Sequence, residues 1–417
     1  MAGSESEREF DLVIRDARIV DGSGAQSFHG DVGVRGAEIA AIGEGLASGA
    51  TEIDAQGLVL APGFVDPHTH YDAQLFWDPL ATPSSLHGVT TVISGNCGFS
   101  LAPLGPGDAD YTARMMANVE GMSLEALKQA LPWDWQGFGD YLARLDGGIA
   151  VNAGFLVGHC AIRRAVMGAD AVGKEASPAQ VEAMTTMLRA SIEAGGLGFS
   201  TSRAFTHSDG DGEPVASRWA GREEVLALAQ EVSRHEGTSL EFIFDGCLNG
   251  FDEEEIALAA EMSRAADRPA NWNVLTVSAA DERNVRAQVA ACEEVARLGG
   301  RIVALTMPVI VDLCMSFKNH CALHKLPGWS EVLRGSVEDQ IERLRDASVR
   351  ETMRERARSP EAGVLRGVAH WGSYRIGAGP NDALASLRDR SVAEIAEERG
   401  ADPFDVLVDI VIEDRLE

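Results

Sequence analysis

The sequence predicts an α/β fold, namely a TIM-like (β/α)8 barrel whose last strand is missing, with a small β domain before it. From residue 58 onward, short apolar segments alternate with helical ones, a pattern typical of a parallel sheet with helical crossovers. The segments expected to form strands are 58–66, 88–94, 151–157, 197–201, 239–245, 270–276 and 301–307. These seven candidates are one fewer than an eight-stranded barrel requires.

Residues 1–62 form the predicted N-terminal β domain, and residues 63–417 form the predicted barrel. Short β-prone runs separated by turn residues such as Asp21-Gly22-Ser23-Gly24 indicate the first domain. These runs cover residues 12–14, 17–20, 32–34 and 39–42.

Helix start and stop signals mark several of the crossovers. Ser177-Pro178-Ala179-Gln180 predicts a capped start, and Gly195-Gly196 predicts the end of the same helix. Further helices are expected over 222–235 and 283–298. From residue 320 the chain becomes helical and charged. Ser391 with Glu394, and Asp402 before Pro403, predict two more helix starts.

The composition excludes several classes of protein. A formal net charge of −28 over 417 residues disfavours nucleic-acid partners, because the phosphate backbone would be repelled. The sequence has no apolar run of about 18 residues that would span a membrane. The polar N-terminus has no signal-peptide pattern, and the six cysteines show no paired spacing. We therefore expect a cytoplasmic protein without a membrane or nucleic-acid partner.

His68-Thr69-His70 is the first segment with the character of a site. In an extended segment His68 and His70 point to the same side, which suits two ligands of one metal ion. Cys97 follows the end of the next predicted strand, and a thiolate is a strong zinc ligand. Because functional residues of barrels gather at the C-terminal strand ends, the three residues predict a site for Zn²⁺ or another divalent metal.

Four segments resemble the amidohydrolase superfamily and, within it, the N-acyl-D-amino-acid deacylases (D-aminoacylases). The superfamily signature is similar to residues 61–70, Ala-Pro-Gly-Phe-Val-Asp-Pro-His-Thr-His. The deacylase branch is similar to residues 95–100 (Gly-Asn-Cys-Gly-Phe-Ser), 158–163 (Gly-His-Cys-Ala-Ile-Arg) and 196–202 (Gly-Leu-Gly-Phe-Ser-Thr-Ser). The resemblance extends over nearly the whole chain, from residue 10 to its end.

This resemblance implies a (β/α) barrel beside a β-sandwich assembled from both chain ends, and amide hydrolysis by a zinc-activated water. It assigns His68, His70 and Cys97 as metal ligands. It also implies histidine ligands after strands five and six, where this chain reads Ser239–Asp245 and Asn271–Leu275 without histidine. The aspartate that such enzymes carry after strand eight is expected outside residues 1–417, as is the remainder of the sandwich.

Other polar residues near predicted strand ends are candidates for contact with substrate. They are His159, Arg163 or its neighbour Arg164, Ser200 with Thr201 and Ser202, Arg203, Glu241 and Asn273. Glu241, Asp245 or Asn273 would alternatively add an oxygen to the metal site or orient a ligand. His207 and the pair His320 and His324 are further possible metal ligands, and Asp209–Glu213 is expected to be a turn rather than a calcium loop.

The sequence thus predicts a metal-dependent amidohydrolase that cleaves a C–N amide bond in a small N-acyl or cyclic amide substrate. The alternative is a catalytically degenerate barrel subunit that binds a ligand or a partner chain, which would complete the barrel. An open sheet edge would favour such a partner chain or self-association.

Overall fold

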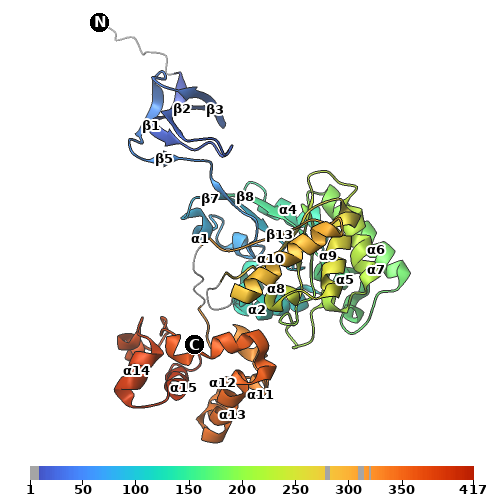
Figure 1. Ribbon diagram of the computed structural model, residues 1–417, viewed down its shortest axis with the longest axis vertical. Helices are drawn as coiled ribbons and strands as arrows, with labels where there is room; N and C mark the ends of the chain where they lie inside the picture. Colours follow the sequence, from blue (N-terminus) through green and yellow to red (C-terminus); the bar gives the residue numbers. More distant parts are fainter. Residues whose placement is uncertain (1–8, 278–281, 309–313, 319–320) are drawn as a thin grey trace. The chain divides into compact units, whose positions relative to one another are not determined.

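The computed structural model describes residues 9–277, 282–308, 314–318 and 321–417. Two compact units are present: one contains the chain up to Asp66 together with Pro83–Thr91, and the other contains Pro67–Thr82 and Val92–Glu417 (Figure 1). The domain boundary at residue 62 stays a prediction. No helix of the described residues is both long enough and apolar enough to cross a membrane.

The first unit contains a five-stranded sheet in the order β3-β2-β1-β4, with β5 also paired to β1. Its strands are β1 (Phe10–Ile19), β2 (Phe28–Arg35), β3 (Glu38–Gly43), β4 (Gly49–Asp54) and β5 (Val59–Leu60). The predicted strands 12–14 and 17–20 are one strand, β1, whose register with β2 shifts between Ile14 and Ala17. At this bulge Asp16 has a φ of 50°, and its backbone N–H donates to Asp31 Oδ1 at 2.9 Å.

The second unit contains a parallel sheet in the order β13-β12-β11-β10-β9. Its strands are β9 (Val157–Gly158), β10 (Gly198–Ser202), β11 (Ser239–Ile243), β12 (Ala270–Trp272) and β13 (Ile302–Ala304). Helices lie between consecutive strands: α5 (His159–Met167), α6 (Pro178–Glu193), α7 (Arg222–Val232), α8 (Gly246–Asn249), α9 (Glu253–Ala266) and α10 (Glu282–Arg297). The predicted alternation of strands and helices is therefore confirmed, whereas closure into a barrel stays a prediction.

A third sheet has the order β6-β7-β8, with strands β6 (Phe64–Asp66), β7 (Val89–Ser94) and β8 (Asn152–Phe155). Two predicted strands are interrupted. Segment 58–66 forms β5 and β6, while segment 151–157 forms β8 and β9 on either side of Leu156, whose N–H donates to Ser94 O at 2.8 Å. Between β7 and β8 lie the helices α2 (Ala109–Glu120), α3 (Leu124–Ala130) and α4 (Phe138–Leu145).

Helix capping follows the predicted residues. Ser177 and Gln180 form a reciprocal capping box at the start of α6, with Pro178 as the first helical residue. A cap of this kind contributes about 1 kcal/mol. Ser391 and Asp402 likewise cap α14 (Val392–Arg399) and α15 (Pro403–Glu413).

The second unit has two hydrophobic clusters. One packs around the parallel sheet and includes Phe199, Phe242 and Trp272. The other joins the helices near the C-terminus through Trp329, Trp371 and others. The helices there are α11 (Trp329–Val332), α12 (Val337–Arg345), α13 (Ala347–Arg358), α14 and α15, so the predicted helical character after residue 320 is confirmed.

Candidate metal centre

His68 and His70 lie just beyond β6, in an extended segment that β7 holds in place. Thr69, between them, donates its backbone N–H to Ile93 O at 2.8 Å, and its hydroxyl lies 2.8 Å from Ser94 Oγ. Thr69 is buried, and the two flanking imidazoles both approach Cys97. The alternation expected of a strand is thus present although the strand itself has ended.

Cys97 reaches the histidines from a tight turn after β7. The turn places Cys97 at a φ of 56° between Gly95 and Gly98, whose φ values are 76° and 77°. A Cβ at Gly95 would lie 2.1 Å from Leu156 O, so the close approach of the backbones requires glycine there. Ser200 Oγ donates to Gly95 O and accepts the Gly98 N–H at 3.1 Å, which fixes both sides of the turn.

The three residues fit a single metal ion. Cys97 Sγ is 3.6 Å from His68 Nε2 and 3.8 Å from His70 Nε2, and the potential ligand atoms all lie within 4.8 Å of one another. Around a tetrahedral zinc ion with bond lengths of about 2.0 Å to nitrogen and about 2.3 Å to sulfur, N···S separations are about 3.5 Å. Two imidazoles and one thiolate also form a donor set that suits zinc.

Burial sets the protonation of these ligands. It lowers the pKa of His68 to about 3, with a contribution from His70, and lowers the pKa of His70 to about 4. Both imidazoles are therefore neutral near pH 7, as metal ligands must be. Burial also raises the pKa of the Cys97 thiol, and the Glu241 and Glu120 carboxyls add to this shift. A bound cation would favour the thiolate in place of the proton.

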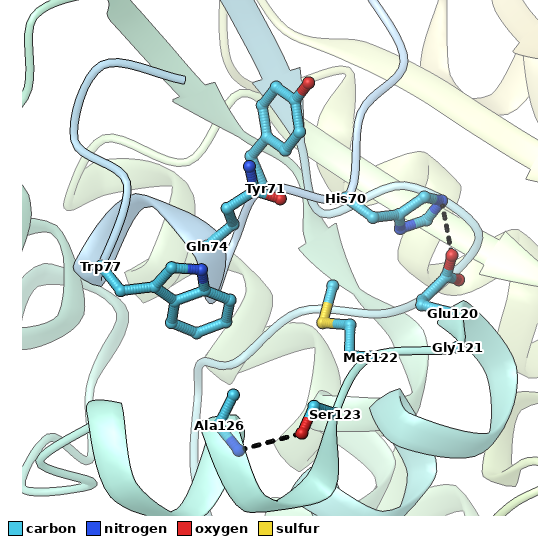
Figure 2. Close-up of a pocket in the computed structure, with 9 residues that line it drawn as sticks. All are labelled: His70, Tyr71, Gln74, Trp77, Glu120, Gly121, Met122, Ser123 and Ala126. Carbon is cyan, nitrogen blue, oxygen red and sulfur yellow. Dashed lines mark hydrogen bonds and ion pairs between the residues drawn. The ribbon is translucent and has the colours of Figure 1, made fainter. Parts of the chain in front are cut away.

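Glu120 is a site residue that sequence reasoning missed. It is the last residue of α2, and its Oε2 lies 3.5 Å from His70 Nε2 (Figure 2). Burial raises the pKa of this carboxyl to about 8. The only sequence signal is an acidic residue directly before the helix stop at Gly121. No strand-end pattern connects that position to His70.

Glu241 and Asn273 support Cys97 from two neighbouring strands of the parallel sheet. Glu241, in β11, accepts the Cys97 N–H at 2.6 Å, and Asn273, just after β12, lies with Nδ2 at 3.4 Å from Cys97 Sγ. Both side chains are buried, and Glu241 Oε1 and Asn273 Oδ1 have no hydrogen-bond partner among the described residues. They offer an oxygen ligand or a fixed dipole beside the metal centre.

His159 and Arg163 belong to a fully buried polar network that bonds to Glu224 of α7. His159 Nε2 lies 2.8 Å from Glu224 Oε1, its Nδ1 lies 2.8 Å from Thr201 Oγ1, and Arg163 Nη1 pairs with the same carboxylate. Because Glu224 is the acceptor, the proton of the neutral His159 ring resides on Nε2. Arg163 also donates to Lys174 O at 2.7 Å, so its guanidinium is committed to internal bonds.

The remaining predicted residues lie around the loop after β10. Arg203 is half-buried, and its N–H donates to Ile243 O at 2.8 Å. His207 Nδ1 lies 2.7 Å from Ser202 Oγ, and its ring is 5.1 Å from that of Phe99, two residues beyond Cys97. His207 thus lies near the metal centre without joining the ligand triad. His320 lies outside the described residues, which leaves the His320 and His324 pair a prediction.

Two cations flank this loop. Arg218 Nη1 donates to His207 O at 3.3 Å, and Lys325 Nζ donates to Ser208 Oγ at 2.5 Å. The predicted turn is present, since Asp209 Oδ1 accepts the N–H groups of Asp211 and Glu213. Arg218 and Lys325 bring positive charge to the side of the site occupied by His207, and their pKa values are lowered chiefly by burial.

A pocket of about 480 Å³ opens beside the metal centre and shares His70 and Glu120 with it. Figure 2 shows the Trp77 ring on the side of the pocket away from the His70–Glu120 pair, with Met122 between them in this view. The pocket therefore extends from the His70–Glu120 pair past Met122 to Trp77.

An extended His-Thr-His pair and a cysteine, gathered beside a parallel α/β sheet, define an α/β protein with a candidate zinc centre. The model of the Amidohydrolase family matches residues 51–416, and the chain belongs to this family. This result confirms the resemblance noted from the sequence motifs.

Three known proteins illustrate the relationship. The D-aminoacylase of Alcaligenes xylosoxydans xylosoxydans is 36% identical over 239 residues, which cover 57% of this chain and 45% of that protein. A crystal structure of D-aminoacylase superposes with a TM-score of 0.60 at 25% identity, covering 96% of this chain and 69% of that one. The zinc-bound N-acyl-D-glutamate deacylase from Bordetella bronchiseptica gives 0.58 at 23% identity, covering 95% and 69%.

These comparisons establish an α/β fold of the amidohydrolase type. The match spans less than half the length of the D-aminoacylase from Alcaligenes xylosoxydans xylosoxydans.

Proposed function

We propose that the chain forms the metal-binding part of an amidohydrolase that cleaves the C–N amide bond of an N-acyl-D-amino acid or a related cyclic amide. The observation that carries this proposal is the convergence of His68, His70 and Cys97 within 4.8 Å. The relationship to D-aminoacylase, and the zinc bound by the N-acyl-D-glutamate deacylase, support it. A TIM-like barrel and a β-sandwich that includes the N-terminal sheet are part of the same proposal.

Each residue of the site has a defined task in this scheme. Zinc, when bound, polarises the amide carbonyl and acidifies a water molecule. His68 and His70 offer neutral nitrogens and Cys97 a thiolate, while the Asn273 amide donates to Cys97 Sγ. Glu241 holds the Cys97 backbone N–H, so the turn keeps the sulfur directed at the imidazoles.

Glu120 is the proposed proton-transfer group contributed by this chain. Its carboxyl lies 3.5 Å from His70 Nε2 and also lines the pocket, so it faces both the metal centre and the bound substrate. In its ionised form, which a bound cation would favour, this carboxyl accepts a proton from the attacking water and returns it to the departing amine. Sequence reasoning placed such a group only outside residues 1–417.

The substrate carboxylate requires a cation, and the site offers three. Arg163 is bonded to Glu224 and to backbone carbonyls, so Arg203, predicted from the sequence, remains together with Arg218 and Lys325. Guanidinium groups pair well with carboxylates. Arg218 combines a guanidinium group with a bond to the loop of His207, since its Nη1 donates to His207 O at 3.3 Å.

The experiment that tests this function measures bound zinc and amine release from N-acetyl-D-amino acids for the purified chain. We expect about one zinc ion per chain, with His70→Ala losing both the ion and hydrolysis. His29→Ala is the matched control, because His29 is an exposed histidine of the other unit. A His70→Ala protein that keeps the zinc content of the wild type contradicts the proposal.

A non-catalytic subunit is the second candidate function. It is favoured by Glu241 and Asn273, which stand on the two strands where the family resemblance implies histidine ligands. In that case the chain binds an ion or a ligand, or associates with a partner chain, without turnover. Zinc binding that depends on His70, combined with no amine release from any N-acyl amino acid, would favour this candidate.

A further inference from the structure

The pocket beside His70 is lined mostly by side chains that carry no charge. Besides His70 and Glu120, its side chains include Trp77, Met122 and Ala126, with Gln74 and Ser123 as neutral polar groups. Its volume of about 480 Å³ suits one side chain or acyl group of a small substrate.

Among the described residues, no lysine or arginine lines this pocket, and Glu120 supplies its only carboxyl. A second anionic group of a ligand bound here would lose its hydration without gaining a cationic partner. The desolvation of such a charge is strongly unfavourable. Glu120 cannot compensate in either protonation state, since its ionised form repels an anion and its neutral form carries no charge. The lining therefore disfavours acidic ligand groups.

The apolar surface of the pocket is available to a ligand. Trp77 is 42% exposed although it is the largest apolar side chain of the lining, and Met122 is only partly buried. A tryptophan ring offers a broad contact face, and methionine adapts to ligands of different shape. Covering these side chains by an apolar group would release water from both surfaces.

We propose that this pocket selects a neutral apolar or aromatic group on the substrate, next to the scissile amide, and rejects a second carboxylate there. The inference rests on the proposed function, because it takes the metal centre as the place where the amide binds. It assigns Trp77 and Met122 as specificity-determining residues.

Calorimetric binding to the zinc-loaded chain tests this assignment without requiring turnover. One ligand pair varies the side chain, N-acetyl-D-methionine against N-acetyl-D-aspartate. The other varies the acyl group, N-butanoylglycine against N-succinylglycine. In at least one pair, we expect the neutral ligand to bind about tenfold more tightly than the acidic one. The pair that shows this difference tells whether the pocket binds the side chain or the acyl group.

Variants connect the preference to the pocket. Trp77→Ala should weaken the roughly tenfold preference, because the neutral ligand loses its apolar contact face. Leu80→Ala should keep the preference, because Leu80 is an exposed apolar residue that lies outside the lining. Met122→Arg should reverse the preference by supplying the missing cation. Circular dichroism confirms that each variant is folded.

Two results would overturn the assignment: equal binding within both pairs, or a preference that Trp77→Ala leaves unchanged. The proposed function fails separately. If neither pair is hydrolysed but the neutral ligand still binds through Trp77, hydrolysis is rejected and the pocket assignment stands. If amide hydrolysis occurs without preference, the pocket assignment is rejected alone.

Discussion

Ser200 is a residue outside the proposed ligand set that positions one of the candidate ligands, Cys97. Its hydroxyl is buried between the two glycines of the Cys97 turn and bonds to the backbone of both. We predict that Ser200→Ala lowers zinc affinity by about tenfold or more, because the turn loses the bonds that aim Cys97. Competition with a chromogenic chelator measures the effect, and Ser233→Ala, on a half-buried position at the end of α7, serves as the control. Unchanged affinity in Ser200→Ala would remove Ser200 from the site.

Glu120 provides a second prediction at the scale of a residue. If its carboxyl transfers protons, Glu120→Gln keeps the shape and the zinc but lowers the hydrolysis rate by about 10²-fold or more. Zinc analysis beside a rate measurement separates this role from that of a ligand. Loss of zinc in Glu120→Gln would make Glu120 a metal ligand, and an unchanged rate would exclude it from catalysis. Glu125→Gln is the matched control, because Glu125 is an exposed residue of α3.

The sequence predicts part of this site and leaves the rest hidden. His68, His70 and Cys97 are accessible to sequence reasoning because strand alternation and strand ends bring them to one side. Glu120 is not, since its position depends on how α2 packs rather than on any local pattern. Arg218 and Lys325 are hidden for the same reason: they come from segments more than 100 residues apart that meet at one loop.

At the scale of elements, local signals predict helices better than strand limits. Ser177 with Gln180 and the glycines after Glu193 define α6 because capping is a local interaction. The strands depend on pairing partners instead. The predicted strands 12–14 and 17–20 fall in the single strand β1 because β2 accommodates a bulge at Asp16. The predicted strand 151–157 is divided into β8 and β9 because Leu156 bonds to Ser94. No local sequence feature shows that β1 pairs with β2 or that Leu156 bonds to Ser94.

The buried network between α5, β10 and α7 predicts how stability depends on pH. Burial lowers the pKa of His159 below 6.5, so the folded chain keeps this ring neutral. The unfolded chain binds a proton there below about pH 6.5, and the free energy of unfolding therefore falls as the pH falls. Burial alone would raise the pKa of Glu224, but its bonds to His159 and Arg163 lower the pKa below 4.5, so the contribution of Glu224 is lost at still lower pH.

Thermal unfolding of the wild type and of His159→Gln from about pH 8 to about pH 5 measures this effect. The wild type should lose stability more steeply than the variant as the pH decreases below the ordinary histidine range. Since His68, His70 and His207 are present in both proteins, the difference between the two slopes isolates His159. Parallel slopes would show that His159 keeps an ordinary pKa in the folded chain.

At the scale of the whole molecule, the residues of the proposed site all lie within the part of the chain that matches the family. The chain matches the family model from residue 51 to 416, while its match to the D-aminoacylase covers 45% of that protein. The ligand triad, the Glu120 carboxyl and the pocket all lie in the second unit. We therefore expect the second unit to bind zinc and to select ligands with its own residues, whether or not a partner chain is present.

X-ray absorption spectroscopy of the zinc-loaded chain tests the central claim most directly, because it reports which atoms surround the ion. The structure predicts one sulfur neighbour at about 2.3 Å together with nitrogen or oxygen neighbours at about 2.0 Å. The sulfur contribution should disappear in Cys97→Ser and persist in Cys314→Ser, whose cysteine is exposed. A zinc ion coordinated by nitrogen and oxygen alone in the wild type, or a sulfur signal that survives Cys97→Ser, would contradict the assignment of His68, His70 and Cys97 as the metal centre.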